Sequence, residues 1–282
     1  MRIVRTIAEM HAQSVAWTTD GRRIGFVPTM GAFHVGHVSL MTQAREQCDI
    51  VVTSLFVNPT QFNEATDLAA YPRDEATDAQ MASDAGVDLL FAPTADEMYP
   101  TGFATTIAVG GLEDVLEGAM RGPQHFRGVA TVVNKLFNIV APHAAFFGQK
   151  DAQQVAVIKR MVADLAMPVE IVVCDIVRES DGLAMSSRNV RLEGDDRTRA
   201  LALWRGLEAA QRVVDAGERH AATVVSVGTE AMKADGIEPE YFVIVDRGSL
   251  APLTKIAGDV LIAVAARVGP VRLIDNIVMR VS

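Results

Sequence analysis

The sequence is poor in cysteine and has no apolar segment long enough to span a membrane. Its 282 residues include only two cysteines, Cys48 and Cys174, which stand far apart, each inside an apolar run. We expect two buried free thiols rather than a disulfide or a metal-binding pair. No apolar run approaches the ~20 residues that a membrane helix requires, and the N-terminal segment lacks the apolar core of a signal peptide. These absences favour a cytoplasmic protein with no membrane partner.

Positive charge is also scarce. The chain has 26 lysines and arginines against 35 acidic residues, a formal net charge of -9. A general nucleic-acid binder requires a basic face, so nucleic acid is not an expected partner, although a local basic pocket is still allowed. Hydrophobic residues at 49% and charged residues at 22% match a folded enzyme. This length favours one large domain with a smaller one appended.

Apolar runs of strand length alternate with helix-period segments over the first part of the chain. The strand-like runs cover 23–29, 49–57, 87–93, 144–148 and 169–177, and the helical segments cover 36–47, 74–86, 126–142 and 151–166. The run 49–57 is continuous and β-branched, which is typical of a central parallel strand buried on both faces. The alternation predicts an α/β fold with a Rossmann-like, doubly wound parallel sheet.

The pattern changes after about Val177. A polar, turn-rich stretch is followed by two helical segments, 195–216 and 220–234, and then by three strand-like runs, 241–246, 259–268 and 271–279. Helices followed by strands that can form hairpins indicate a second, smaller α+β domain. The sequence therefore predicts one domain over 1–176 and another over 177–282.

Two histidines follow the first strand-like run, in the stretch "VPTMGAFHVGHVSL" over 27–40. Ligands bind open α/β sheets at the carboxyl ends of strands. A helix that starts near Gly36 presents unpaired N–H groups, which favour phosphate. His34 and His37 add side-chain donors in the same turn. The alternative is that both histidines only cap the helix. The H-x-G-H pattern resembles the signature of the nucleotidylyltransferase superfamily.

Two further strand ends carry polar residues. "FVNPTQF" over 56–62 ends a strand at Asn58 and offers the amide of Gln61, although it could be a plain turn. "FGQKD" over 147–151 opens a helix after a strand, which places Lys150 where phosphate is favoured. A lysine there is otherwise a solvated surface residue.

The polar stretch between the two domains contains "AMSSRN" over 184–189. Ser186 and Ser187 can donate hydrogen bonds, and Arg188 offers a planar fork to phosphate or carboxylate. An arginine in such a loop is more often exposed to solvent, so both interpretations stay open.

Six motifs occur in the order and spacing of the pantothenate synthetase (pantoate:β-alanine ligase) family, which the chain resembles over nearly its whole length. They are "PTMGAFHVGHVSL", "FVNPTQF", "YPRD", "HFRGVATVVNKLFNIV", "FGQKDAQQ" and "MSSRN". The resemblance implies an ATP-dependent condensation of D-pantoate with β-alanine through a pantoyl adenylate, releasing AMP and pyrophosphate. It also implies Mg²⁺, a C-terminal lid domain, a homodimer, and a place in pantothenate (vitamin B5) and coenzyme A biosynthesis.

The same resemblance assigns roles to residues of this chain. The catalytic, phosphate-stabilising set is His34, His37, Lys150 and Arg188. The other positions implied to bind ATP are Met30, Gly36, Gly148, Asp151, Val177, Met185, Ser186 and Ser187. Pantoate is implied to bind Gln61, Gln154, Asn58 and Arg121, and Asp78 matches an acidic position associated with magnesium.

The chain departs from the family pattern at three places. Gln149 stands where members commonly have glutamate, so any role of a carboxylate there is lost. "RGPQHF" carries an extra residue between Arg121 and His125, which puts the reach of Arg121 in doubt. Phe33 replaces the more usual leucine and changes only packing volume.

Three other functions compete with this one. Another nucleotidylyltransferase, acting on a phosphate substrate, would share H-x-G-H but lack the "NPTQF" and "MSSRN" pair. A nucleotide-binding regulatory protein without turnover would lack catalytic cations, whereas Lys150 and Arg188 are both present. A tRNA-charging enzyme would require a basic surface, which the net charge of -9 disfavours.

Overall fold

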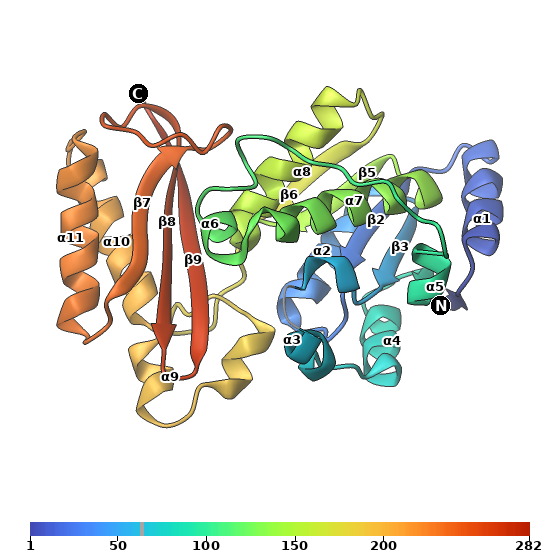
Figure 1. Cartoon of the computed structure of the whole chain (residues 1–282), viewed down its shortest axis with the longest axis horizontal. Coiled ribbons are helices and arrows are strands. Elements are labelled where there is room, and N and C mark those ends of the chain that lie inside the picture. Colours follow the sequence, from blue (N-terminus) through green and yellow to red (C-terminus); the bar gives the residue numbers. More distant parts are fainter. Residues whose placement is uncertain (63–64) are drawn as a thin grey trace. The chain divides into compact units, whose positions relative to one another are not determined.

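The chain forms two compact units, Met1–Asp175 and Ile176–Ser282. A computed structural model describes residues 1–62 and 65–282 (Figure 1). The division falls one residue before the boundary expected from the sequence.

The first unit is built on a six-stranded sheet whose strands all pair in parallel. The order across the sheet is β1-β4-β3-β2-β5-β6. Its strands are β1 (Arg2–Val4), β2 (Ile24–Thr29), β3 (Ile50–Leu55), β4 (Leu89–Phe91), β5 (Ala144–Gly148) and β6 (Glu170–Cys174). The predicted doubly wound α/β fold is confirmed.

The sheet reverses its strand order at β2. This strand pairs with β3 on one side and with β5 on the other. In open α/β sheets the connections leave a crevice at such a point, beyond the carboxyl ends of the strands. The segments that follow β2, β3 and β5 therefore meet at one edge of the sheet.

Helices connect the strands of the first unit (Figure 1). They are α1 (Ile7–Thr19), α2 (Val35–Gln47), α3 (Ala65–Ala70), α4 (Glu75–Asp84), α5 (Ala95–Met98), α6 (Glu117–Arg121), α7 (Pro123–Val140) and α8 (Ala152–Asp164). The predicted apolar face of α7 is confirmed, since Val129, Val132, Val133, Leu136, Phe137 and Val140 are all buried. Burial of each large apolar side chain contributes about 1.5–3 kcal/mol, so this helix is a principal support of the sheet.

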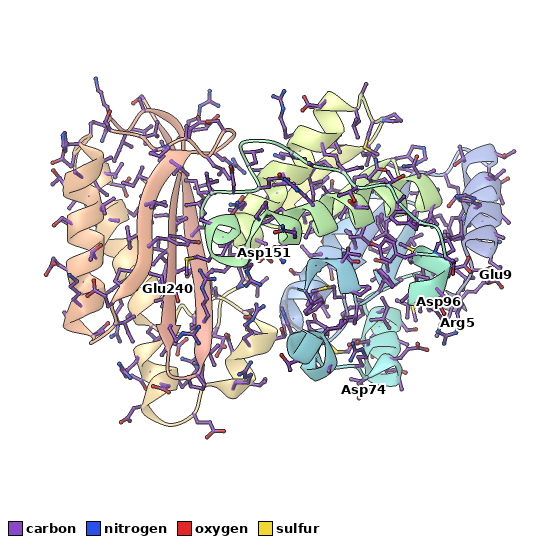
Figure 2. The ribbon with its side chains drawn as sticks, in the orientation of Figure 1. Arg5, Glu9, Asp74, Asp96, Asp151 and Glu240 are labelled. Carbon is purple, nitrogen blue, oxygen red and sulfur yellow. The ribbon has the colours of Figure 1, made fainter. Side chains whose placement is uncertain are left out.

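Strand β1 and helix α1 were not among the predicted elements. Helix α1 begins with a capping box, in which Thr6 Oγ1 accepts from Glu9 N at 3.2 Å and Glu9 Oε2 accepts from Thr6 N at 3.2 Å. Glu9 is labelled in Figure 2. The T-x-x-E spacing is a helix-start signal that is visible in the sequence and could have revealed this helix.

The second unit is α+β, as predicted. Its three-stranded antiparallel sheet has the order β7-β8-β9. Two long helices contact each other and the sheet. The elements are α9 (Asp195–Arg199), α10 (Ala202–Asp215), α11 (Ala221–Ala234), β7 (Pro239–Asp246), β8 (Gly258–Val268) and β9 (Val271–Val281). A Cβ at Gly206 would lie 2.7 Å from Met232 Cγ and 3.0 Å from the oxygen of Gly228, so glycine permits this close contact of α10 with α11.

The single helix predicted over 195–216 is wrong, because it is divided into α9 and α10. The N–H of Leu201 donates to the oxygen of Thr198, and that of Leu203 to Ala200, each three residues back. This tighter winding interrupts the α-helical hydrogen bonds and turns the chain between the two helices.

Both cysteines are free and buried, as expected. Within residues 1–62 and 65–282, none of the helices combines the length and apolar character needed to cross a membrane.

Candidate active site

The turn after β2 is held by hydrogen bonds to its neighbouring strand. Thr29 Oγ1 donates to the oxygen of Ser54 at 2.6 Å and accepts from Gly31 N at 3.3 Å. Gly31 has a φ of +88°, and a Cβ there would lie 2.6 Å from Leu55 Cδ1. Glycine is strongly favoured at this position, because the left-handed backbone and the close approach both disfavour a side chain. The turn is thus shaped before helix α2 begins.

His34 and His37 both cap helix α2 through Nδ1. His34 Nδ1 accepts from Gly36 N at 3.1 Å, and His37 Nδ1 accepts from His34 N at 3.4 Å. The capping interpretation of the two histidines is therefore confirmed as geometry. An imidazole whose Nδ1 accepts a hydrogen bond carries its proton on Nε2. Each ring is thus left with an Nε2–H donor, so the cap does not preclude binding of an anion.

Both histidines are neutral near pH 7. Burial lowers the pKa of His37 to about 3, and the neighbouring His34 adds to the effect. Burial and then the positive charge of Lys150 lower the pKa of His34. The charge of Asp151 acts in the opposite direction on both rings. The two rings are 4.2 Å apart between centroids and serve as uncharged donors.

The segment after β5 lies beside the turn after β2, because β5 pairs with β2 and helix α2 contacts β5. The charges of Lys150 and Asp151 also act on the pKa values of both histidines. Both residues belong to a short 3-10 helix, Gln149–Asp151, that leads into α8. Lys150 is half-buried, Asp151 (labelled in Figure 2) is exposed by its accessible surface, and Gln149 is buried. Gly148 is the last residue of β5, so four predicted ATP or phosphate positions lie near one edge of the sheet: His34, His37, Lys150 and Asp151.

The segment after β3 contacts the turn after β2, which carries His34 and His37 and which we call the histidine turn. Gln61 Nε2 lies 2.8 Å from Met30 Sδ. Asn58 Nδ2 donates to Gln61 Oε1 and to the oxygen of Gly128, each at 3.1 Å, while Asn58 Oδ1 accepts from Tyr99 Oη at 2.8 Å. Asn58 is only 1% exposed, so a bond from it to a ligand would require one of these contacts to break. Its amide holds the Gln61 side chain beside Met30.

His125 belongs to this group, although the sequence analysis gave it no role. Its Nδ1 donates to the oxygen of Gln61 at 2.8 Å. Burial lowers its pKa, and the charge of Arg121 adds to the effect, which puts Arg121 near the same place. Arg121 also pairs with Glu117, N to O at 3.2 Å. The extra residue expected between Arg121 and His125 falls where α6 ends at Arg121 and α7 begins at Pro123.

Two neighbouring glutamines in α8 differ in their surroundings. Gln153 is buried, and its amide donates to the oxygens of Leu112 and Val115, each at 2.7 Å, so it anchors the segment before α6. Gln154 is half-buried and makes no hydrogen bond with another described residue. Its amide therefore remains available to a ligand, and its contact with pantoate stays a prediction.

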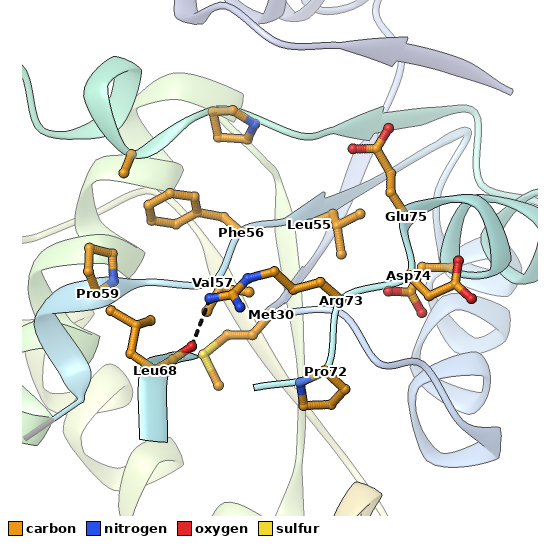
Figure 3. A pocket seen from close by; sticks show the side chains of 13 residues that line it. Met30, Leu55, Phe56, Val57, Pro59, Leu68, Pro72, Arg73, Asp74 and Glu75 are labelled. Carbon is orange, nitrogen blue, oxygen red and sulfur yellow. Dashed lines mark hydrogen bonds between the residues drawn. The ribbon is translucent and has the colours of Figure 1, made fainter. Parts of the chain in front are cut away.

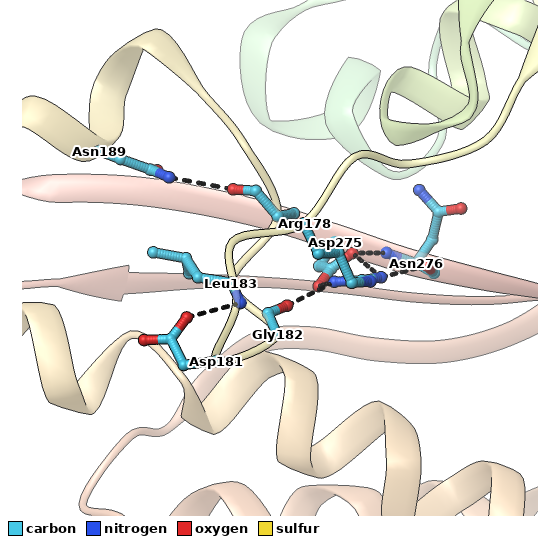
Figure 4. Close-up of polar contacts among 8 residues, drawn as sticks. Arg178, Asp181, Gly182, Leu183, Asn189, Asp275 and Asn276 are labelled. Atoms are coloured by element: carbon cyan, nitrogen blue, oxygen red, sulfur yellow. Dashed lines mark hydrogen bonds and ion pairs between the residues drawn. The ribbon is translucent and has the colours of Figure 1, made fainter. Parts of the chain in front are cut away.

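In the second unit, the segment Ala184–Asn189 is held by an ion pair at its base (Figure 4). Arg178 donates to both carboxylate oxygens of Asp275, at 2.7 and 2.9 Å, and its guanidinium stacks on Trp204 at 3.8 Å. Asn189 Nδ2 donates to Glu179 Oε1 at 3.0 Å. None of these supporting residues was singled out from the sequence.

The predicted ATP positions of the second unit lie in this segment and next to it. Met185 N donates to the oxygen of Val177 at 2.9 Å. Ser186 Oγ accepts from Arg188 N at 3.3 Å and caps the 3-10 helix Ser187–Arg191. The Arg188 side chain is exposed and has no bonded partner among the described residues. Its fork is therefore available to an anion.

A cavity of about 360 Å³ lies beside the histidine turn, at the ends of β3 and β4 (Figure 3). Its lining includes Met30 and the carboxylates of Asp74, Glu75 and Asp78. Each carboxylate is already engaged: Asp74 accepts from Thr77 N at 3.1 Å, Glu75 pairs with Arg5 at 2.5 Å, and Asp78 accepts two backbone N–H groups.

The residues near Asp78 do not fit a protein-built magnesium site. Magnesium takes oxygen ligands in an octahedron, commonly one or two carboxylates with phosphates and water. No group of three or more histidine, cysteine, aspartate or glutamate side chains that could hold a metal was found in the described part of the chain. The atoms that face the Asp78 oxygens are N–H donors, which repel a cation.

The comparisons with known proteins agree with the fold. A family model described as "Pantoate-beta-alanine ligase" matches residues 2–278. Pantothenate synthetases of Heliobacterium modesticaldum and Moorella thermoacetica are 53% and 51% identical, with all of each chain covered.

Solved structures give the same relationship. Pantothenate synthetase from Thermus thermophilus has a TM-score of 0.91 at 46% identity, covering 98% of this chain and 99% of that one. Pantoate-beta-alanine ligase from Francisella tularensis, in complex with beta-gamma ATP and beta-alanine, has a TM-score of 0.78 at 34% identity, covering 98% and 97%. At these identities the similarity extends over the full length of both units. The chain therefore belongs to the pantoate-beta-alanine ligase family.

Proposed function

We propose that this chain joins D-pantoate to β-alanine with consumption of ATP, and that the reaction proceeds through a pantoyl adenylate. The observation that carries the proposal is the meeting of His34, His37 and Lys150 at the carboxyl edge of the sheet, in a chain that belongs to this family. The Francisella tularensis relative was solved with beta-gamma ATP and beta-alanine bound. Its ligands support ATP and β-alanine as substrates here.

In the first step, a pantoate carboxylate oxygen bonds to the α-phosphorus of ATP, and the bond from that phosphorus to the pyrophosphate oxygen breaks. The substrate is itself the nucleophile, so the protein contributes position and electrostatic stabilisation. His34 and His37 donate uncharged Nε2–H groups to phosphate oxygens, while Lys150 and Arg188 supply positive charge. Fixed donors stabilise the growing charge without having to reorganise during the reaction.

In the second step, the amine of β-alanine attacks the acyl carbon of the adenylate, AMP leaves, and the amine loses a proton. Gln61 and Gln154 hold pantoate through neutral amides, which leave its carboxylate free to attack. Arg121 is a further pantoate contact in this proposal, and Asn58 contributes by holding Gln61.

The remaining nucleotide contacts are proposed from both units. They are Met30, Gly36, Gly148, Asp151, Val177, Met185, Ser186 and Ser187. An acyl adenylate hydrolyses readily, so the second unit is proposed as a lid that keeps water from it.

Mg²⁺ is proposed to accompany ATP and to neutralise charge on the phosphate oxygens, which supply most of its ligands. We further propose that the protein works in the cytoplasm as a homodimer. Family membership supports the proposals of Mg²⁺, the cytoplasm and a homodimer.

The test is isotope exchange between pyrophosphate and ATP with the purified protein. We expect exchange that requires pantoate and proceeds without β-alanine, because the adenylate forms before the amine acts. Exchange without pantoate, or no exchange with any hydroxy acid, would overturn the proposal. A phosphate-bearing acceptor that supports exchange would instead favour another nucleotidylyltransferase reaction.

A further inference from the structure

We propose that Asp78 is a positioning residue, a buried carboxylate of α4 that holds the histidine turn by two backbone N–H groups, and not a magnesium ligand. The catalytic consequence rests on the proposed function, whereas the structural part does not. We call the segment Gly31–His34 the clamped turn.

The contacts of Asp78 are directed at consecutive residues of the clamped turn. Asp78 Oδ2 accepts from Ala32 N at 2.9 Å, and Oδ1 accepts from Phe33 N at 2.7 Å. The side chain is 3% exposed, so water does not compete for these bonds. Hydrogen bonds to a charged group contribute about 1.5–3 kcal/mol each, more than neutral ones. Helix α4 is thereby tied to the start of α2.

The clamped turn requires such support because its backbone is strained. Gly31 and Ala32 both have positive φ, +88° and +53°. The left-handed region costs a residue with a Cβ roughly 1–2 kcal/mol, so Ala32 would relax without a partner for its N–H. A Cβ at Gly31 would lie 2.9 Å from Asp78 Oδ2, which shows how closely the carboxylate fits beneath the turn.

Every N–H of the clamped turn donates to a side chain. Gly31 donates to Thr29, Ala32 and Phe33 donate to Asp78, and His34 donates to His37 Nδ1. Asp78 therefore holds Phe33, and the next residue, His34, donates the hydrogen bond that fixes the His37 ring. A shift of Phe33 moves His34 and its N–H, and with them both Nε2–H donors. Asp78 thus acts on the reaction through the two histidines.

The decisive variant is Asp78→Asn, with Asp84→Asn as matched control. The amide keeps the size of the side chain but turns an NH₂ group toward one of the two N–H donors. Asp84 lies on the same helix, is exposed, and among the described residues accepts a hydrogen bond only from Gln80, so its variant makes the same change in charge away from the turn.

In magnesium-free protein, ¹⁵N-edited NMR of the imidazoles should show altered Nδ1 and Nε2 resonances of His34 and His37 in Asp78→Asn and unchanged ones in Asp84→Asn. The kcat of pantoate-dependent exchange should fall about 10²-fold, the loss typical of a displaced catalytic group. The Mg²⁺ concentration for half-maximal rate should stay within about twofold of wild type, because uniform binding of the metal is untouched. Unchanged imidazole resonances, or rescue of the rate by excess Mg²⁺, would overturn the proposal.

A second variant keeps the test valid if Asp78→Asn does not fold. Gly31→Ala places a methyl group against Leu55 and Asp78 from the turn side and should reproduce the shifted imidazole resonances with an unchanged Mg²⁺ requirement. Wild-type imidazole resonances in a folded Gly31→Ala protein would contradict the clamp. If wild-type protein shows no pantoate-dependent exchange, the proposed function fails, and the imidazole spectra still decide whether Asp78 holds the turn.

Discussion

The two turns proposed to bind phosphate are built in different ways. In the first unit, the clamped turn donates all of its N–H groups to side chains, and His34 and His37 are half-buried and neutral. In the second unit, the segment Ala184–Asn189 is fixed by the ion pair of half-buried Arg178 with buried Asp275, while Arg188 in the segment is exposed.

The difference separates two kinds of electrostatic stabilisation. Neutral donors held by backbone hydrogen bonds keep their direction but carry no net charge, which suits a site that is present before substrate arrives. An exposed guanidinium carries a full charge and retains side-chain freedom until an anion engages it. Substitutions at Lys150, Asp275, Arg188 and His37 test the two kinds of stabilisation separately.

Replacement of the cation beside the neutral histidines should have the largest effect. Lys150→Ala should lower the rate of pantoate-dependent exchange by about 10³-fold, since the histidines cannot substitute for its charge. Lys159→Ala, an exposed position on α8, is the control with the same change in charge. A loss of exchange rate below about tenfold would mean that the neutral histidine donors are enough to stabilise the phosphate charge.

Loss of the ion pair in the second unit should be the next largest effect. Asp275 is 4% exposed, and Asp275→Asn leaves Arg178 without its charged partner, which should lower the free energy of unfolding by about 3 kcal/mol. Urea denaturation followed by Trp204 fluorescence in a Trp17→Phe background reports on this unit alone. Asp259→Asn removes the exposed pair with Arg280 and should cost under about 0.5 kcal/mol. Equal losses from the two variants would show that burial of the pair is irrelevant.

Removal of the exposed guanidinium should affect activity and leave stability unchanged. Arg188→Ala should slow adenylate formation about 10²-fold, measured in single-turnover quench experiments. Arg191→Ala removes an exposed arginine of the same 3-10 helix and should behave like wild type. Near-normal adenylate formation in Arg188→Ala would eliminate this residue from the phosphate-binding set.

The last effect, which is the smallest when taken per pH unit, concerns pH. His37 has a folded-state pKa of about 3 against an ordinary value of 6.5, so below 6.5 the unfolded chain binds a proton that the folded chain does not. Stability contributed by neutral His37 is therefore complete above 6.5 and falls with pH, by roughly 1.4 kcal/mol per unit, until about 3. His37→Gln should flatten this slope in denaturation measured at several pH values, whereas His11→Gln, at an exposed position of α1, should keep it. An unaltered slope in His37→Gln would mean that the ring is not neutral in the fold.

Much of the fold was predictable because strand and helix periods are local properties. The runs that became β2, β3 and β5 and the apolar face of α7 follow from side-chain alternation within a few residues. The division between α9 and α10 was missed because both sides of Ala200 have helical composition, and the tighter hydrogen bonds there depend on packing. The interpretation of the histidines as helix caps and their interpretation as ligand donors were offered as alternatives, yet Nδ1 serves the cap while Nε2 remains available.

The family and the α/β and α+β classes followed from the sequence alone, because motifs and periodicity are written in the order of residues. The same motifs singled out His34, His37, Lys150 and Arg188 as predicted phosphate-binding residues. The surroundings of these side chains depend on the folded structure. Burial made the histidines neutral, the amide of Asn58 oriented Gln61, and the carboxylate of Asp78 came to lie under Ala32 and Phe33. Such contacts join residues up to 46 positions apart. The protonation and direction of a side chain depend on what the fold brings next to it, and that is not encoded in its neighbours along the chain.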